Sequence, residues 1–305
     1  MADTAPAPPR PDRPMDRRQR SVLITGCSSG IGEAAAHTLR GRDWRVFATA
    51  RRDEDVARLQ AMGFESLRLD YHDEASLVAG AREVLERTDG RLDALFNNGA
   101  FAIPGAIEDL PADALRDLFQ ANFFGWHTLT RAILPAMRAQ GGGRIVQCSS
   151  ILGFIGMPYR GAYNASKFAL EGYSDTLRLE LAGTGIHVSL IEPGPIATRF
   201  TENAMAKFHE VIGEEGLAVS PHRASYEARL ARMAAGEPSP FKRPPRAVVR
   251  QLVHALEASR PRPRYRTTVP TRVMAVARRM LSTRMMDRVL ARAARGEEQA
   301  GPAGR

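Results

Sequence analysis

Short apolar runs alternate along the chain with longer segments in which apolar residues recur at helical spacing. The first run, Ser21 to Thr25, is mostly apolar and is followed at once by glycines, which is typical of a strand buried on both faces of a sheet. The pattern predicts five further strands, at residues 44–50, 64–70, 92–97, 144–149 and 186–191. It also predicts helices at residues 31–40, 53–62, 73–88, 112–140 and 163–181.

This alternation of strands and helices predicts an α/β fold, a single doubly wound domain of the Rossmann type with a parallel sheet. In such sheets ligands bind in the crevice at the carboxyl ends of the strands. The residues that directly follow each strand are therefore the first place to look for chemistry.

The pattern changes after Thr198. Residues 199–242 mix predicted helix and loop with scattered apolar side chains, and we interpret them as a helical lid. Residues 246–258 predict a helix, and the alternation at 262–269 is compatible with an edge strand. Residues 271–294 predict one basic, amphipathic helix.

Composition divides the chain into three parts. Residues 1–20 are rich in Pro, Arg and Asp and lack the apolar stretch of a signal peptide, so they predict a disordered N-terminal tail. The main domain is expected at residues 21–268, and an amphipathic basic extension at 269–305. No apolar run approaches the roughly 20 residues that cross a bilayer, so a cytoplasmic protein is expected.

The strong positive charge raises the question of a nucleic-acid partner. The formal net charge is +9 and the isoelectric point is near 10.2. Arg outnumbers Lys 40 to 3, however, which indicates a coding bias, and the excess is concentrated in residues 241–295, where fifteen Lys and Arg face two acids. We therefore predict no nucleic-acid partner. The two cysteines and scattered histidines predict neither a disulfide framework nor a metal site.

A glycine-rich loop, Thr25 to Gly32, follows the first strand and opens the first helix. Glycines let a backbone turn tightly and approach a pyrophosphate, which the N–H groups of a helix N-terminus then bind. A plain strand-to-helix turn is the alternative. The predicted cofactor contacts in this loop are Gly26, Ser28, Ser29, Gly30, Ile31 and Gly32.

The end of the second strand indicates which nicotinamide cofactor is used. An NAD(H) site would place an acid here to hold the ribose hydroxyls. The chain has Arg51 and Arg52 instead, and a guanidinium pairs well with a 2′-phosphate, so Arg51 favours NADP(H) over NAD(H). A solvated turn is the alternative for this pair. Asp70, which ends the third strand, is placed to reach the adenine edge.

Tyr163 and Lys167 lie four residues apart and so share one face of a predicted helix. A tyrosine normally has a pKa near 10. We expect the Lys167 ammonium, together with an oxidised nicotinamide, to lower the pKa of Tyr163 toward the working pH of a general acid or base. Ser149 and Ser150 follow the fifth strand, where one hydroxyl could stabilise the developing oxyanion of a carbonyl substrate.

Together these motifs resemble the short-chain dehydrogenase/reductase family over nearly all of residues 21–200. The resemblance implies a catalytic set of Asn122, Ser150, Tyr163 and Lys167, with Lys167 binding the nicotinamide ribose and Asn122 holding a water. It implies that the Pro193–Thr198 segment holds the nicotinamide, through Pro193, the Ile196 backbone and the Thr198 hydroxyl. Tyr163 and Lys167 thus belong to both the catalytic and the cofactor set.

One segment departs from the family pattern. The family usually has Asn-Asn-Ala-Gly after the fourth strand, whereas this chain has Asn97-Asn98-Gly99-Ala100. The resemblance still implies that Asn97 and Gly99 lie at the cofactor, but the order of the two small residues puts the local backbone path in doubt.

The resemblance implies an NADP(H)-dependent oxidoreductase that interconverts an alcohol with its ketone or aldehyde. Around Tyr163 and Pro193 the sequence is most similar to the 17β-hydroxysteroid dehydrogenase and retinol dehydrogenase group, which implies a bulky apolar substrate and a lid at 199–242 that covers it. A homodimer or homotetramer is the family habit.

Two alternatives remain open. The first is a regulatory protein that binds NADP(H) on the same fold without turning over a substrate. The second gives the helix at 271–294 a role at an anionic membrane surface. Packing of the apolar side of that helix on the domain or on a second subunit is favoured over the membrane.

Overall fold

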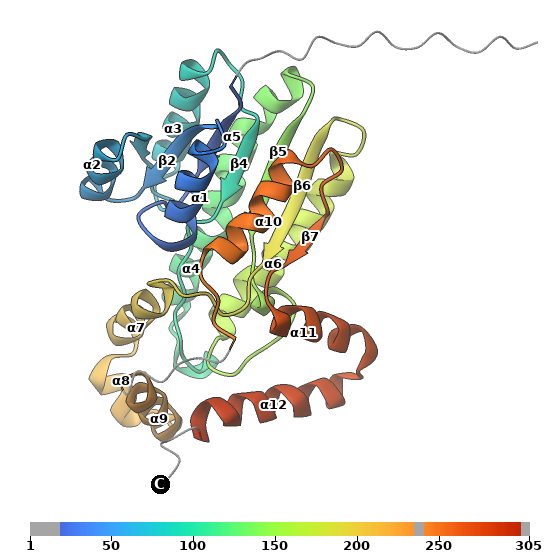
Figure 1. Ribbon diagram of the computed structural model, residues 1–305. Coiled ribbons are helices and arrows are strands. Elements are labelled where there is room, and N and C mark those ends of the chain that lie inside the picture. Colours follow the sequence, from blue (N-terminus) through green and yellow to red (C-terminus); the bar gives the residue numbers. More distant parts are fainter. Residues whose placement is uncertain (1–18, 235–240, 300–305) are drawn as a thin grey trace, which may run out of the picture.

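The computed structural model describes residues 19–234 and 241–299, and a seven-stranded parallel sheet forms its centre (Figure 1). The strand order is β3-β2-β1-β4-β5-β6-β7, and all six neighbouring pairs are parallel. The doubly wound α/β fold predicted from the sequence is therefore confirmed. The predicted tail at residues 1–20 lies almost entirely outside the described residues. The strands are β1 (Ser21–Ile24), β2 (Arg45–Ala50), β3 (Glu65–Arg68), β4 (Ala94–Asn97), β5 (Gly143–Cys148), β6 (Ile186–Glu192) and β7 (Arg264–Arg266).

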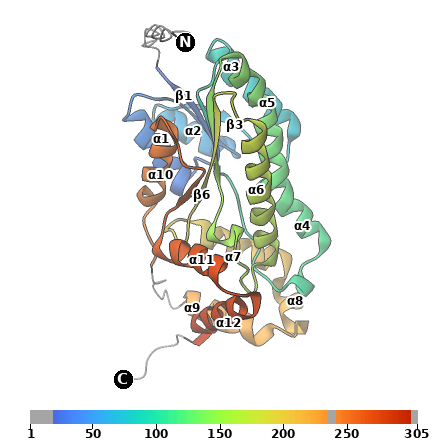
Figure 2. The same ribbon diagram turned by 90° about the vertical axis from the view of Figure 1, so that its right-hand side faces the viewer.

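Helices cover both faces of the sheet (Figure 2). On one face α1 (Gly30–Arg40) packs against α10 (Arg246–Glu257), and on the other α3 (Glu74–Arg87), α5 (Gly125–Ala139) and α6 (Gly161–Glu180) lie side by side. The helix α2 (Asp53–Ala61) follows β2. Burial on both faces explains why the strands are apolar runs and not alternating patterns, since every residue of β1 and β4 is buried.

The direction of strand order reverses between β1 and β4. In doubly wound sheets the ligand crevice lies at this switch point, outside the carboxyl ends of the two strands. The glycine loop after β1 and the segment Asn97–Gly99 after β4 therefore border the same crevice.

The helix predicted at 112–140 contains a local change of winding. It consists of α4 (Ala112–Phe119), a π-helical turn at Gln120–Phe124, and α5. Such turns frequently occur at functional sites, and this one carries Asn122, which is fully buried.

The segment after β6 forms a layer of helices at the carboxyl ends of the strands (Figure 1). The predicted lid contains α7 (Phe200–Val211), α8 (Gly213–Val219) and α9 (Arg223–Ala234). Residues 235–240 of that lid lie outside the described residues. None of the described helices is long and apolar enough to cross a bilayer.

The prediction of one helix at 271–294 is wrong. The chain forms α11 (Val269–Met280) and α12 (Thr283–Gln299), which are separated at Leu281 and Ser282. Both helices pack part of their apolar side on the loop that follows β5, while Val273, Val276 and Met280 remain exposed. The contact joins Ile151, Leu152, Phe154, Ile155 and Met157 to Met274, Ala277, Leu281, Met286 and Leu290.

Candidate active site

The glycine loop is shaped by close backbone contacts. Gly26 and Gly30 have φ angles of 68° and 63°, which favour glycine. A Cβ on Gly32 would lie 2.2 Å from the Gly26 carbonyl oxygen, and a Cβ on Gly26 would lie 2.6 Å from the Gly99 Cα. The loop after β1 thus touches the loop after β4, and a bare backbone faces the crevice, as a pyrophosphate site requires. Ser28, Ser29 and Ile31 are half-buried beside these glycines.

Tyr71 explains the reversed order of the two small residues after β4. The Tyr71 side chain is buried, and its hydroxyl donates a hydrogen bond to Thr25 Oγ1 at 2.6 Å. A Cβ on Gly99 would lie 3.1 Å from this ring, and a Cβ on Gly125 would lie 2.7 Å from it. Glycine at position 99, where the family usually has alanine, therefore makes room for Tyr71.

Thr25 and Asn98 join the two loops, and neither is among the site residues predicted from the sequence. Thr25 Oγ1 accepts hydrogen bonds from the backbone N–H groups of Asn98 (2.8 Å) and Gly99 (3.2 Å). The Asn98 side chain donates to the Thr25 carbonyl at 3.0 Å. Both are polar residues that stand at the end of a strand and beside a glycine, and this pattern could have identified them in the sequence.

Asn97 does not turn its side chain toward the crevice. The residue is fully buried, and its Nδ2 donates to Thr130 Oγ1 at 3.1 Å, on α5. The Asn97 side chain therefore does not make the predicted cofactor contact, which leaves only the backbone of this residue for it.

Asn122 is held by the backbone of Phe101. Its Oδ1 accepts from the Phe101 N–H at 3.1 Å and its Nδ2 donates to the Phe101 carbonyl at 2.8 Å. The side-chain amide thus fixes the loop after β4 to the π-helical turn. The role of Asn122 in holding a water stays a prediction.

Arg51 follows β2 and is exposed, and among the described residues its guanidinium makes no ion pair. The neighbouring Arg52 lies 3.5 Å from Glu54. Asp70 accepts a hydrogen bond from the His72 N–H at 3.1 Å, which leaves its second oxygen 3.8 Å from Arg68. These positions leave Arg51 available for an anionic partner at the edge of the crevice.

The segment after β6 closes over the glycine loop. The Ile151 N–H donates to the Pro193 carbonyl at 2.8 Å, and Ile196 forms a parallel bridge with Arg243. A Cβ on Gly30 would lie 3.0 Å from the methyl carbon of Thr198. The predicted cofactor segment therefore lies between the glycine loop and the start of the lid.

Tyr163, Lys167 and Ser150 come together at the carboxyl end of β5. The α6 helix begins at Gly161, and Tyr163 and Lys167 on its first turns are 8 % and 1 % exposed. The Lys167 Nζ donates to the Cys148 carbonyl at 2.8 Å, and it lies 4.2 Å from the Trp126 ring centroid and 5.7 Å from that of Tyr163. One lysine N–H is thus used by the protein, and two remain for a ligand.

Ser150 is the serine that joins this group. Its Oγ accepts a hydrogen bond from the Leu152 N–H at 3.1 Å, and its side chain lies close enough to Tyr163 to lower the pKa of the phenol. The hydroxyl of Ser149 lies on the other side, beside Gly153 and Glu171, because a Cβ on Gly153 would be 2.6 Å from Ser149 Oγ and 3.1 Å from Glu171 Oε1. The position of the two serines at the strand end does not show which of them faces the substrate. The structure places Ser150, and not Ser149, beside Tyr163.

Burial dominates the ionisation of Tyr163 and Lys167. Burial raises the pKa of Tyr163 above its usual range, and the Cys148 thiol adds to the rise, while the hydrogen bond with Ser150 opposes it. Burial also lowers the pKa of Lys167 to about 8, which Cys148 and Glu171 oppose. Burial therefore sets the direction of the shift for the chain's own residues, and the lowering expected from Lys167 together with an oxidised nicotinamide stays a prediction.

Apolar side chains surround the exposed edge of Tyr163. Its ring lies edge-to-face with Phe200 at the start of α7, with centroids 5.5 Å apart. The same cluster contains Ile103 from the loop after β4, Leu118 from α4, and Phe208, Ile212 and Tyr226 from the lid. No group of three or more His, Cys, Asp or Glu is placed to hold a metal ion in the described part of the chain.

Comparison with known proteins covers most of the chain. A family model described as short chain dehydrogenase matches residues 20–208. The Escherichia coli K12 protein named Uncharacterized oxidoreductase YbbO is 42 % identical over 273 residues, which are 89 % of this chain and 94 % of that protein. Human 17-beta-hydroxysteroid dehydrogenase type 1 is 36 % identical over 262 residues, which are 81 % of this chain and 77 % of that protein. A solved short-chain dehydrogenase from Streptomyces avermitilis is 30 % identical, with a TM-score of 0.70 over 92 % of this chain and 99 % of that one.

Proposed function

This chain belongs to the short-chain dehydrogenase family, and from that premise we propose that it is an NADP(H)-dependent oxidoreductase that interconverts an alcohol with its ketone or aldehyde. The predicted resemblance to the 17β-hydroxysteroid dehydrogenase group is confirmed by the similarity to the human enzyme. The observation that carries the proposal is the buried arrangement in which the Ser150 side chain lies beside Tyr163 and Lys167 lies one helical turn away.

The residues present fit a nicotinamide cofactor. The glycine loop offers a backbone cradle that a Cβ on Gly26, Gly30 or Gly32 would obstruct. Arg51 offers a free guanidinium at the end of β2, where the chain has no acid. When bound, the reduced cofactor would supply the hydride.

Each side chain of the site has one task in the proposed reduction. The Ser150 Oγ accepts from Leu152, which positions the side chain, and its proton is then donated to the carbonyl oxygen of the substrate. Tyr163, whose raised pKa keeps it protonated at neutral pH, then donates its proton to that oxygen. The Lys167 ammonium stabilises the phenolate that forms, and Asn122 holds the loop beside them in place.

The apolar cluster around Tyr163 supports a bulky apolar substrate. Phe200 and Phe208 from the lid, together with Ile103 from the loop after β4, provide side chains that cannot hydrogen-bond a polar substrate. The relative named for a hydroxysteroid supports the same substrate class.

A homodimer or homotetramer stays a prediction, and two exposed aromatic rings support it. Phe124 in the π-helical turn and Phe168 on α6 are 49 % and 40 % exposed, and the two segments contact each other. Exposed apolar patches of this kind often mark subunit interfaces.

The pH dependence of carbonyl reduction tests the assigned roles. Lys167 loses its charge as the pH rises through its pKa of about 8, so we expect kcat/KM for reduction to fall above that pH. Measurement between about pH 6 and about pH 10 should show the decline. Because the Glu171 carboxylate raises the pKa of Lys167, Glu171→Gln should move the decline to lower pH. A rate that rises through this range would contradict the role of Lys167.

A further inference from the structure

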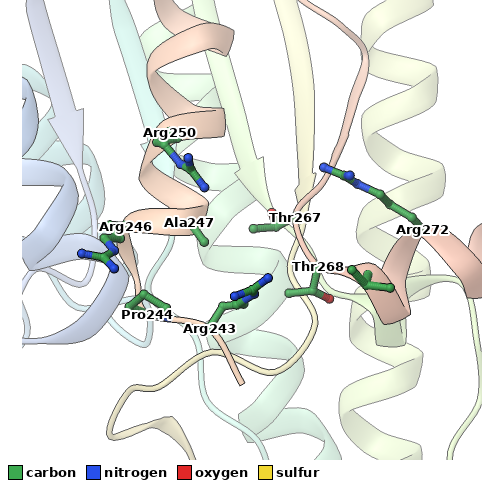
Figure 3. Close-up of a pocket in the computed structure, with 9 residues that line it drawn as sticks. Arg243, Pro244, Arg246, Ala247, Arg250, Thr267, Thr268 and Arg272 are labelled. Atoms are coloured by element: carbon green, nitrogen blue, oxygen red, sulfur yellow. The ribbon is translucent and has the colours of Figure 1, made fainter. Parts of the chain in front are cut away.

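A cavity of about 260 Å³ lies between the start of α10, the end of β7 and the start of α11 (Figure 3). We call it the arginine cavity because four arginines and two threonines line it. These residues are Arg243, Arg246, Arg250, Arg272, Thr267 and Thr268. The lining includes no residue of the glycine loop and none of the four residues proposed for catalysis.

Three of the arginines face this space from opposite sides. Figure 3 shows Arg243 and Arg250 reaching in from the α10 side and Arg272 from α11, while Arg246 turns away. No acid lines the cavity, and among residues 19–234 and 241–299 none of these guanidinium groups makes an ion pair. Like charges that share one cavity repel each other, so an anion placed among them would be stabilised.

The arginines of the neighbouring strand β7 form ion pairs with carboxylates. Arg264 on β7 contacts Glu171 and lies 2.5 Å from Asp175 and 3.1 Å from Glu192. Arg266 lies 3.1 Å from Glu192. The partly buried arginines of β7 are therefore neutralised by carboxylates of the chain itself, whereas the four arginines of the cavity are exposed and no carboxylate of the described ranges pairs with them.

Neutral donors add to the charge. The Thr267 hydroxyl is buried and has no hydrogen-bond partner. Thr268 is 2 % exposed and precedes α11, and its hydroxyl binds that of Thr271 at 2.9 Å instead of capping the helix. The N-terminus of α11 therefore lacks a side-chain cap and favours negative charge, although Pro270 contributes no N–H.

We propose that the arginine cavity binds a phosphate group of a ligand other than the nicotinamide cofactor. Guanidinium groups on two sides suit a tetrahedral dianion better than a planar carboxylate. The volume is several times the roughly 30 Å³ of a water, so it also accommodates part of the group that carries the phosphate.

Two sources of such a phosphate are compatible with the surroundings. One is a soluble phosphate ester. The other is a phospholipid headgroup, because an exposed apolar stripe runs along α11 from the rim of the cavity. The stripe consists of Val269, Val273, Val276 and Met280, which are 52 %, 53 %, 56 % and 78 % exposed.

The test uses the full chain saturated with NADPH, so that the phosphates of the cofactor cannot account for the signal. Inorganic phosphate is titrated by calorimetry, and the thermal stabilisation that it causes is measured in parallel. Arg250→Gln and Arg272→Gln should each weaken phosphate binding by about tenfold or more, since each removes a charge-assisted contact. Arg279→Gln, an exposed arginine of α11 outside the cavity, is the matched control and should bind as the parent does.

A second readout separates loss of the site from loss of the fold. Without phosphate, Arg250→Gln should melt at the same temperature as the parent or higher, because it removes a repelling charge. Equal phosphate affinity in the parent and both cavity variants, or no binding in the parent, would overturn the proposal.

Two further probes identify the source of the phosphate. Retention on phosphatidylglycerol vesicles, but not on phosphatidylcholine vesicles, that is lost in Arg250→Gln supports a phospholipid headgroup. Binding of glycerol 3-phosphate without vesicle retention, also lost in Arg250→Gln, supports a soluble ester. Retention that persists in Arg250→Gln counts against the cavity.

Discussion

Replacement of Tyr163 by phenylalanine is expected to lower kcat for carbonyl reduction by about a thousandfold, the usual contribution of a general acid. The substitution removes only a hydroxyl. The ring remains 5.5 Å from Phe200, and Lys167 keeps its contacts with the Cys148 carbonyl and Trp126. NADPH affinity should therefore change by no more than about twofold. Steady-state kinetics and a fluorescence titration of NADPH measure the two quantities.

The matched control is Tyr173→Phe, on the same helix. The Tyr173 hydroxyl lies 3.1 Å from His127 Nδ1, away from the site, so its loss should leave kcat within about threefold. If Tyr163→Phe retained more than about a tenth of the parent activity, Tyr163 would not be the proton donor.

Replacement of Arg51 by glutamine is expected to weaken NADPH binding by about tenfold to a hundredfold and to leave NADH binding unchanged. The exposed guanidinium has no ion pair among the described residues, so a 2′-phosphate would be its partner. The substitution should therefore lower the preference for NADPH over NADH, because it removes only the contact with the 2′-phosphate and leaves the contacts that both cofactors share. Titration of both cofactors against both proteins measures that difference.

Arg52→Gln is the control for this prediction. Arg52 is the next residue, is also exposed, and lies 3.5 Å from Glu54, so its removal should cost less NADPH affinity. An equal loss of NADH and NADPH binding in Arg51→Gln would show that Arg51 does not recognise the 2′-phosphate.

The sheet could be predicted from the sequence because both of its faces are covered. Burial on both faces makes each strand a continuous apolar run, and the runs at 21–25 and 144–149 agree with β1 and β5 within a few residues. The break between α11 and α12 could not be predicted in the same way. Apolar residues continue at helical spacing across Leu281, so the hydrophobic pattern alone predicts one helix where the chain forms two.

The candidate site was predictable where a local motif carried it. The spacing of Tyr163 and Lys167 places both on one helical face, and the strand end places Ser150 beside them. Contacts between distant segments were not visible. The bond from Tyr71 to Thr25 and the inward turn of Asn97 depend on which strands become neighbours, and the raised pKa of Tyr163 depends on how deeply α6 is buried.

The fold explains part of the arginine excess of residues 241–295. The sequence pattern attributes it to coding bias and excludes a nucleic-acid partner. In the fold, Arg243, Arg250 and Arg272 converge on one cavity that no acid lines. That convergence required β7 to lie beside β6, which no local pattern specifies.

Hydride transfer tests the central claim most directly. The enzyme is incubated with NADPH carrying deuterium at the reactive carbon of the nicotinamide, together with a panel of steroid ketones, retinal, long-chain aldehydes and small ketones. We expect at least one bulky apolar carbonyl to give an alcohol with one deuterium on the former carbonyl carbon, with NADPH preferred to NADH and Tyr163→Phe nearly inactive. Absence of deuterated alcohol from every carbonyl, or equal formation by Tyr163→Phe, would contradict the account.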